Sequence, residues 1–344
     1  MNINELLAES VKQSASDLHL TAGSVPILRV DGEMRPLDHP ECDDDILRDG
    51  LISLMPDATK VQYEKSHDVD FSIEIDGLAR FRVNVFRQRK GVGAVFRTIP
   101  SQVMSLEQLE APEIFRDIID APRGLVLVTG PTGSGKSTTL AAMVDHINRN
   151  KALHILTIED PIEFVHDNQR SLVNQRELHR DTDSFATALR AALREDPDVI
   201  LVGEMRDLET VRLALTAAET GHLVLATLHT ASAPKTIDRM IDVFPGEDKP
   251  MARAMLSESL RAVVSQQLVK KVFGGRVAAH EIMIANSAVR NLIREGRVAQ
   301  LYSTLQTSSA QGMQTLEQSL KKLVQQGDIS QQEARRCAGD KEGL

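Results

Sequence analysis

The stretch Gly130-Pro-Thr-Gly-Ser-Gly-Lys-Ser137 decides how the rest of the sequence is interpreted. It follows the apolar run Leu125–Val128 and opens a helical pattern over Lys136–Asn148, which is the strand, loop and helix order that the Walker A pattern requires. Glycines in such a loop let backbone N–H groups converge on phosphate oxygens, and the start of the helix adds positive potential. The sequence therefore predicts a P-loop that binds ATP.

The loop residues have separate predicted roles. We expect Lys136 to neutralise charge on the β- and γ-phosphates and the hydroxyl of Ser137 to bind Mg²⁺. A chance glycine turn is the alternative, and the flanking strand and helix patterns argue against it. The predicted nucleotide-binding residues are Thr132, Gly133, Ser134, Gly135, Lys136, Ser137 and Thr138.

Glu204 ends a second apolar run, Asp198-Val-Ile-Leu-Val-Gly203. This is the layout of a Walker B element, with glutamate where many P-loop proteins carry aspartate. We expect Glu204 to support Mg²⁺, through water, or to help orient the attacking water. A solvent-exposed acid at the end of a strand is the alternative.

Three more acids, Glu159, Asp160 and Glu163, follow the run His154–Ile158. In an open α/β sheet, ligands bind beyond the carboxyl ends of the strands, so these acids should face the phosphates. Glu163 is the candidate for polarising the hydrolytic water, with the other two supporting the site. An acidic surface loop is the alternative.

Histidines and arginines supply further candidates. His222 and His229 bracket the run Leu223–Leu228, where an imidazole could sense the γ-phosphate, although a packing or capping role is the alternative. A ring enzyme can supply an arginine to the active site of a neighbouring subunit, whereas most arginines on strands only form a solvated surface. The arginines in the first hundred residues that are candidates for this role are Arg80, Arg82, Arg87, Arg89 and Arg97.

Residues 1–100 predict a small α+β domain. A helical start leads to a short strand at Asp17–Leu20 and a tight turn at Asp31-Gly32, and a second helical stretch covers Asp44–Glu64. Three alternating runs follow, and Asp76-Gly77 between the first two is a strong hairpin signal because both residues tolerate positive φ. The three runs are Val69–Ile75, Leu78–Arg87 and Gly93–Ile99.

Residues 101–122 predict a linker, and residues 123–344 predict an α/β domain. Apolar strands alternate there with helical patterns at Ser184–Arg194 and Leu208–Thr220, which indicates a largely parallel sheet covered by helices. The last hundred residues are predicted to be mainly helical, with one hairpin around Gly274-Gly275. The amphipathic segments are Met251–Lys271, Ala288–Arg294, Met313–Gln326 and Ser330–Cys337.

Composition limits the classes of partner. The net charge of −9 lacks the basic character that phosphate-backbone binding favours, so nucleic acid is not expected as a partner. Cys42 and Cys337 lie far apart, without the spacing of a zinc or redox site, which favours a reducing cytosol. No secretory signal or membrane-spanning run is predicted, so any membrane association should go through another protein.

Four motifs resemble those of the secretion ATPases of type II and type IV pilus systems, and within them the pilus retraction ATPases. The segment Ala288-Val-Arg-Asn-Leu-Ile-Arg-Glu295 is also similar to a motif associated with retraction, with Val289 where isoleucine is usual. The four motifs are Gly130–Thr138, Thr157-Ile-Glu-Asp-Pro-Ile-Glu163, Leu201-Val-Gly-Glu-Met-Arg-Asp207 and Thr220-Gly-His-Leu-Val-Leu-Ala-Thr-Leu-His-Thr230.

This resemblance implies a PAS-like N-terminal domain and a RecA-like ATPase domain with a helical C-terminal part. It also implies a cytoplasmic homohexamer that is peripheral at the inner membrane, where it meets a platform protein of the pilus machinery. Residue by residue, it makes Glu204 the Walker B acid, Glu163 the catalytic acid and His229 the better sensor. It favours Arg82 and Arg97 as the arginines offered to a neighbouring site.

Several other functions remain open on the sequence. Relatives that drive pilus extension or secretion carry a four-cysteine insertion and a longer N-terminal part, so the two-cysteine chain favours retraction. An accessory retraction ATPase or a related secretion ATPase is the first alternative. A small-molecule P-loop kinase and a nucleotide-dependent regulatory module are further alternatives, which the separate N-terminal domain and the acids at strand ends disfavour.

Overall fold

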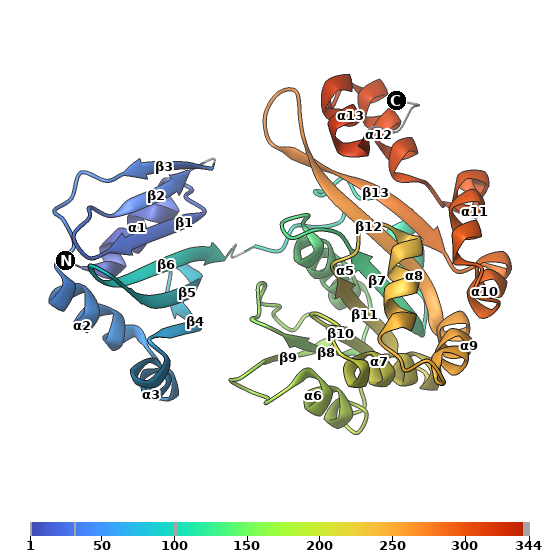
Figure 1. Cartoon of the computed structure of the whole chain (residues 1–344), viewed down its shortest axis with the longest axis horizontal. Coiled ribbons are helices and arrows are strands. Elements are labelled where there is room, and N and C mark those ends of the chain that lie inside the picture. Colours follow the sequence, from blue (N-terminus) through green and yellow to red (C-terminus); the bar gives the residue numbers. More distant parts are fainter. Residues whose placement is uncertain (1, 31, 100–101, 340–344) are drawn as a thin grey trace. The chain divides into compact units, whose positions relative to one another are not determined.

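The computed structural model describes residues 2–30, 32–99 and 102–339 of the chain. Its contacts divide the chain into two units, Met1–Gln102 and Val103–Leu344, each with its own sheet (Figure 1). Asp31 of the predicted turn, and the predicted boundary between residues 100 and 101, lie outside the described residues.

Alternating apolar residues in the first unit build an antiparallel six-stranded sheet in the order β3-β2-β1-β6-β5-β4. The turn at Asp76-Gly77 joins β4 to β5 as predicted, with Gly77 at φ 72°. The predicted helical stretch 44–64 is divided into two helices. The elements are α1 (Ile3–Lys12), β1 (Asp17–Thr21), β2 (Ile27–Val30), β3 (Glu33–Pro36), α2 (Asp44–Leu54), α3 (Asp57–Ser66), β4 (Asp68–Ile75), β5 (Ala79–Gln88) and β6 (Gly91–Ile99).

The two faces of this sheet differ in chemistry. On one face, Leu18, Phe96 and Val83 lie side by side across three strands and are fully buried in the core that α1 and α2 complete. The opposite face carries polar residues in register, because side chains alternate along each strand. That polar row consists of Arg29, Asp17, Arg97 and Arg82.

The second unit contains a seven-stranded sheet in the order β13-β12-β7-β11-β10-β8-β9. All neighbouring pairs are parallel except β12 and β13, which form an antiparallel hairpin at the edge. The strands are β7 (Gly124–Thr129), β8 (His154–Glu159), β9 (Leu172–Glu177), β10 (Val199–Val202), β11 (Leu223–Leu228), β12 (Leu260–Lys270) and β13 (Arg276–Ile284).

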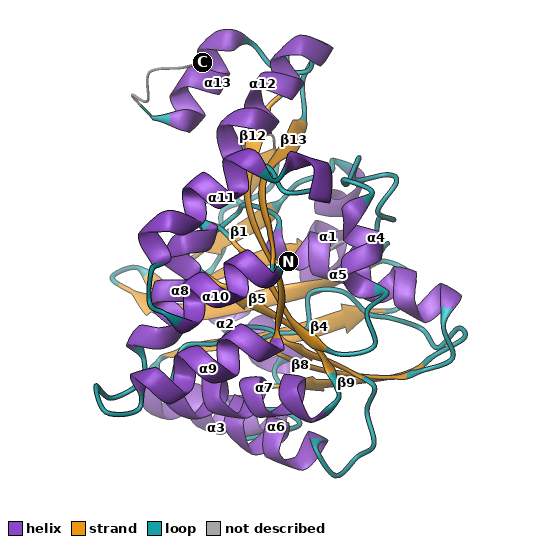
Figure 2. Cartoon of the chain, turned by 90° about the vertical axis from the view of Figure 1, so that its right-hand side faces the viewer, coloured by secondary structure: helices purple, strands orange, loops and turns teal. Residues whose placement is uncertain are grey.

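Helices cover both faces of this sheet, as the alternation of strand and helix patterns predicts. Helices α8, α9, α10 and α11 lie on one side of β12 and β13, and α4 and α5 lie on the other (Figure 2). The helices are α4 (Ile114–Ile119), α5 (Lys136–Asn150), α6 (Phe185–Ala192), α7 (Leu208–Thr220), α8 (Ala233–Asp242), α9 (Lys249–Ser259), α10 (Ser287–Arg294), α11 (Leu301–Thr307), α12 (Leu316–Gln326) and α13 (Gln331–Ala338), with short 3₁₀ turns at Val298–Gln300 and Ser309–Gln311.

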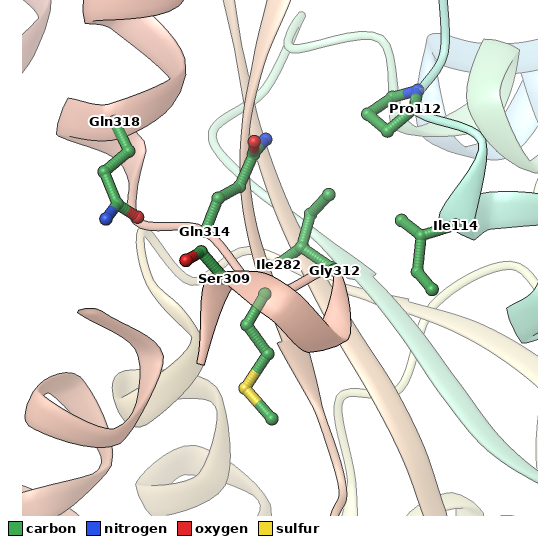
Figure 3. A pocket seen from close by; sticks show the side chains of 8 residues that line it. Pro112, Ile114, Ile282, Ser309, Gly312, Gln314 and Gln318 are labelled. Carbon is green, nitrogen blue, oxygen red and sulfur yellow. The ribbon is translucent and has the colours of Figure 1, made fainter. Parts of the chain in front are cut away.

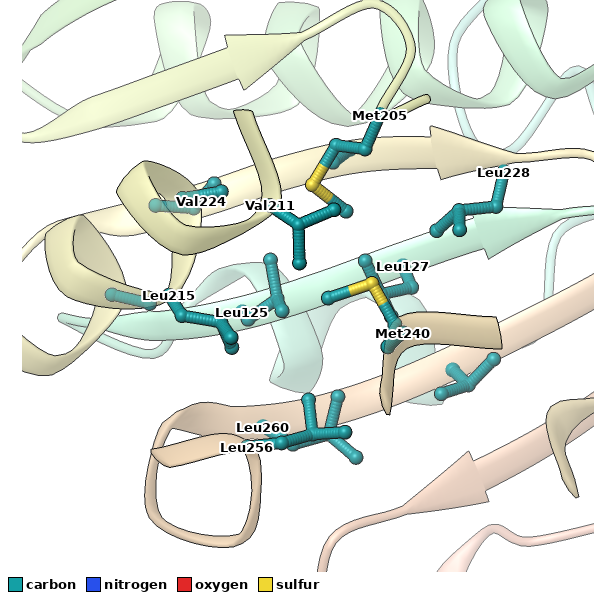
Figure 4. Packing of buried hydrophobic residues seen from close by; sticks show 14 of the residues in the cluster. Leu125, Leu127, Met205, Val211, Leu215, Val224, Leu228, Met240, Leu256 and Leu260 are labelled. Carbon is teal, nitrogen blue, oxygen red and sulfur yellow. The ribbon is translucent and has the colours of Figure 1, made fainter. Parts of the chain in front are cut away.

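The core has a layer on each face of the parallel strands. Figure 4 shows Leu125 and Leu127 of β7 packed with Leu215 of α7 and Met240 of α8 on one face. Alternate β7 residues, such as Val126, pack on the other face against α4 and α5. Because both faces are buried, the strands read as continuous apolar runs, which is why the sequence predicts them well.

Two segments differ from the prediction. The predicted amphipathic segment Met251–Lys271 is helical only through Ser259, and its second half is the strand β12. An apolar run buried on both faces cannot be distinguished from a buried helix by periodicity alone. The edge strand β9 was not predicted, because its Leu172-Val-Asn-Gln-Arg-Glu177 sequence is mostly polar.

Side chains cap the first turns of most helices in the second unit. Each capping residue accepts a hydrogen bond from a backbone N–H that has no partner within its helix. The caps are Ser184 for α6, Asp207 for α7, Ser232 for α8, Asn286 for α10, Thr315 for α12 and Ser330 for α13. The first turn of α5 has no side-chain cap, so its N–H groups are available to a ligand.

No helix in the described part of the chain is long and apolar enough to cross a membrane.

Candidate nucleotide-binding site

The phosphate loop lies between the carboxyl end of β7 and the start of α5. Gly130, Gly133 and Gly135 all have positive φ, at 144°, 77° and 87°. At Gly130 glycine is required by space as well, because an added Cβ would lie 2.3 Å from the carbonyl oxygen of Gln266. Ser134 is buried, and its hydroxyl oxygen has no hydrogen-bond partner within the described residues.

Exposure differs among the other predicted loop residues. Thr132 and Gly133 are exposed, and Ser137 and Thr138 are half-buried in the first turn of α5. A buried hydroxyl without a partner and a helix start without a cap are features of a site that a polar ligand completes.

Lys136 is buried, with 8% of its surface exposed. Its ammonium group donates to the carbonyl oxygens of Gly130 and Pro131, both at 3.0 Å, and lies 3.4 Å from Nδ1 of His229. Burial lowers the pKa of Lys136, while the carboxylates of Glu204 and Glu163 oppose that change. The loop thus holds a concentrated positive charge whose present partners are mostly neutral carbonyls.

Glu204 follows β10, and His229 lies between it and Lys136. One carboxylate oxygen lies 3.4 Å from Nε2 of His229, and the other accepts a hydrogen bond from Arg206 at 2.6 Å. Burial raises the pKa of Glu204, but Arg206 and His229 outweigh that effect and hold it below its ordinary value. Glu204 is therefore held as a carboxylate.

His229 lies between Lys136 and Glu204, one residue beyond the carboxyl end of β11. A lysine ammonium only donates and a carboxylate only accepts hydrogen bonds. These partners therefore assign the tautomer with a free lone pair on Nδ1 and the proton on Nε2. Lys136, His229 and Glu204 form a continuous polar chain at the carboxyl ends of the parallel strands.

His222 lies at the opposite edge of the sheet, which corrects its prediction as a sensor. Its carbonyl oxygen accepts from the N–H of Gly124 at the beginning of β7, and its Nδ1 lies 3.0 Å from the carbonyl oxygen of Ala217. The six residues of β11 separate it from His229, a length of about 20 Å at the usual rise per residue. The structure does not bring His222 to the phosphate loop.

The acidic residues at and after the end of β8 include Glu163, whose negative charge opposes the lowering of the Lys136 pKa by burial. Glu163 is exposed and acts on Lys136 through its charge. Burial raises the pKa of Glu159 to about 7, even though its carboxylate accepts hydrogen bonds from Thr157 at 2.6 Å and Gln175 at 3.1 Å. The loop carrying Glu163 is fixed in part by Glu177, whose carboxylate accepts from the N–H of Ile162.

Arg82 and Arg97 are direct neighbours on β5 and β6 of the first unit. The guanidinium of Arg97 donates to Asp17 at 2.9 Å, and that of Arg82 lies 3.7 Å from Asp70. Their side chains are 67% and 42% exposed. Both cations therefore reach solvent from one face of the sheet.

Two residues of the site were not predicted, Arg206 beside Glu204 and Gln266 beside the phosphate loop. Arg206 lies two positions after Glu204, and the motif Leu201–Asp207 could have drawn attention to it. Gln266 lies on β12, where its side chain bonds to Ser134 and Thr139. Because that segment was predicted to be helical, nothing in the sequence pattern indicated that Gln266 lies beside the loop.

A separate cavity of about 460 Å³ lies between α4, β13 and residues 309–318 (Figure 3). The side-chain amides of Gln314 and Gln318 already bond to the chain itself, to the carbonyl of His280 and the N–H of Thr315. Lysine and arginine are absent from its lining, so it does not suit a nucleotide. The lining residues are Pro112, Ile114, Ile282, Ser309, Gly312, Met313, Gln314 and Gln318.

Residues 1–336 match the sequence family described as "Type II/IV secretion system protein". The chain belongs to the type II/IV secretion system protein family. It is 62% identical over 338 residues to the type IV pilus retraction ATPase PilT of Pseudomonas aeruginosa, covering 98% of each protein. It is also 58% identical over 344 residues to a twitching motility protein of Neisseria gonorrhoeae, covering 100% of this chain and 92% of the relative.

A solved structure of this family has the same fold. The crystal structure of the pilus retraction motor PilT with bound ADP superposes with a TM-score of 0.94 at 48% identity, over 100% of this chain and 99% of the other. The type IV pilus ATPase PilU of Pseudomonas aeruginosa is less similar, at 41% identity over 97% of this chain and 88% of the relative. This family member is an ATPase with a nucleotide-binding P-loop, as its sequence predicted.

Proposed function

We propose that this ATPase hydrolyses ATP in the presence of Mg²⁺ to power retraction of a type IV pilus, and hence twitching motility. The relative at 62% identity supports the retraction function, the relative at 58% supports twitching motility, and the lower identity to PilU argues against the accessory role. The observation that carries the chemistry is the polar chain of Lys136, His229 and Glu204 beside an uncapped helix start.

In this proposal, Lys136 exchanges the carbonyl oxygens of Gly130 and Pro131 for phosphate oxygens. When the Lys136 ammonium group moves to the phosphates, it leaves Nδ1 of His229. The imidazole then responds to the γ-phosphate, and its contact with Glu204 changes accordingly. Glu163, exposed beside the loop, takes a proton from the attacking water. Thr132, Gly133, Ser134, Gly135 and Thr138 complete the binding loop.

The donor set suits Mg²⁺. Magnesium prefers oxygen ligands and keeps several waters, so a site with a hydroxyl, a nearby carboxylate and phosphate oxygens meets its needs. Ser137 supplies the hydroxyl in the first turn of α5. Glu204, whose carboxylate contacts Arg206 and His229, is the acid that would support the ion. When bound, Mg²⁺ would neutralise charge that develops on the phosphates.

The working assembly in this proposal is a homohexameric ring in the cytoplasm, held at the inner membrane by a platform protein of the pilus. Each chain contributes two domains, which the sequence predicts at residues 1–100 and 123–344; the predicted linker, residues 101–122, contains α4, which packs in the core of the second unit. Arg82 and Arg97 of one subunit serve the active site of its neighbour. Their exposure on one face, with cations side by side, supports that role.

A lysine variant tests this function. Lys136→Ala should abolish ATP turnover by the purified chain and twitching by cells that carry it, because the phosphates lose their buried cation. Lys322→Ala, on an exposed position of α12, is the matched control and should retain both. Light scattering on the same samples with ATP should give a hexamer. Twitching by the Lys136→Ala strain, or a persistent monomer, would contradict the motor.

A further inference from the structure

A buried glutamine contacts the phosphate loop from a neighbouring strand. Gln266 is 3% exposed and lies on β12, which pairs with β7 so that Ser265 stands beside Thr129, the last residue before the loop. The hydroxyls of Ser265 and Thr129 lie 2.6 Å apart, which fixes the two strands together at this point. Gln266 is the next residue along β12, at the level of the loop.

The side-chain amide of Gln266 makes two hydrogen bonds, one as a donor and one as an acceptor. Its Nε2 donates to the backbone carbonyl of Ser134 at 2.7 Å, and its Oε1 accepts from the hydroxyl of Thr139 at 2.9 Å. A carbonyl oxygen cannot donate, so only the NH₂ group can face Ser134, and the orientation of the amide is settled by its partners. The side chain therefore joins the loop to the first turns of α5.

The bond to Ser134 controls the peptide unit that follows it. In a trans peptide, the carbonyl of one residue and the N–H of the next point in opposite directions. When Gln266 holds the carbonyl of Ser134 toward β12, the N–H of Gly135 is turned away from β12. Gly135 has φ 87°, in the left-handed region that glycine populates about as readily as the right-handed one, so the backbone preference of Gly135 does not select this orientation.

We propose that Gln266 is a positioning residue for nucleotide binding, which presets the Ser134–Gly135 peptide so that its N–H faces the phosphates. The inference deepens the proposed function, since it rests on this loop being the phosphate site. The close approach of the Gln266 backbone to Gly130 supports it, because both ends of the loop then rest on the same residue. Without the amide, the buried carbonyl of Ser134 turns to find another donor and takes the N–H with it.

The test compares binding of Mg-ADP to full-length variants by calorimetry. Gln266→Leu and Gln266→Met keep the side-chain volume and add no charge, and each removes both bonds. Each should weaken Mg-ADP binding roughly 10- to 100-fold, the value of one charge-assisted hydrogen bond. Thr139→Val is the matched control, which removes only the bond to α5 and should weaken binding by less than about threefold.

Three results would overturn the inference. They are wild-type affinity in a folded Gln266→Leu or Gln266→Met variant, an equal loss in Thr139→Val, and an equal loss of affinity for adenosine, which lacks phosphates. Thermal melting with and without Mg-ADP identifies variants that fail to fold. If Gln266→Leu fails to fold, the unbranched side chain of Gln266→Met provides the same test. Wild-type protein that binds Mg-ADP without ATP turnover would refute the motor alone, whereas no nucleotide binding would refute both.

Discussion

Replacing Glu159 with glutamine should change the pH dependence of folding stability. Burial raises the pKa of this carboxyl from 4.5 to about 7, against the hydrogen bonds from Thr157 and Gln175 and with a further contribution from the charge of Glu163. The folded protein therefore holds a proton that the unfolded chain has released above pH 4.5. Neutral glutamine has nearly the shape of the protonated side chain.

The size of the effect follows from the pKa change. The stabilisation by the bound proton is complete below pH 4.5 and is lost as the pH rises through about 7. The rise from 4.5 to about 7 corresponds to roughly 3 kcal/mol of folding free energy. In Glu159→Gln, the amide oxygen keeps the two hydrogen bonds that Oε1 accepts, so packing is retained. The variant has no proton to release, so it does not lose this stability as the pH rises.

Urea unfolding followed by circular dichroism measures the difference. Relative to the wild type, the free energy of unfolding of Glu159→Gln should increase between about pH 5 and about pH 7 and then level off. Glu247→Gln, at an exposed position, controls for the loss of one negative charge. A difference between Glu159→Gln and the wild type that stays constant across this range would refute the reasoning.

Two further substitutions test the geometry of the site. Gly130→Ala should abolish binding of Mg-ADP in calorimetry, since its Cβ would lie 2.3 Å from the carbonyl of Gln266, and retained affinity would contradict the observed loop. Arg206→Ala should move the acid limb of the ATPase pH profile to higher pH. The hydrogen bond and charge of Arg206 help to lower the pKa of Glu204, and an unmoved limb would remove Glu204 from catalysis.

The phosphate loop could be predicted because strand, loop and helix are consecutive in sequence. Glu204 and His229 could be predicted to approach Lys136 for a different reason. They follow parallel strands, whose carboxyl ends meet at one edge of the sheet. The same rule places His222 at the other edge, because it precedes β11 whereas His229 follows it. That distinction was available from the sequence once the strand direction was considered.

Gln266 could not be predicted in the same way. Its strand is buried on both faces, so its periodicity fits a helix as well as a strand, and nothing local indicates that it pairs with β7. The pairing joins residues more than a hundred positions apart, as does the hydroxyl contact of Ser265 with Thr129. Such contacts depend on the order of strands in the sheet, which sequence patterns do not encode locally.

The motif Ala288–Glu295, which lies on α10, contacts the beginning of the same strand, β12. Val289 and Ile293 are fully buried, and the guanidinium of Arg290 donates to the carbonyls of Ser257, Glu258 and Leu260 at the junction of α9 and β12. A guanidinium at the end of a helix satisfies carbonyls that have no partner within it. The motif that resembles a retraction signature therefore anchors the beginning of β12, the strand that carries Gln266 to the phosphate loop. Its residues thus fall into two classes, since the buried face and Arg290 hold the fold, while Asn291 and Glu295 are exposed.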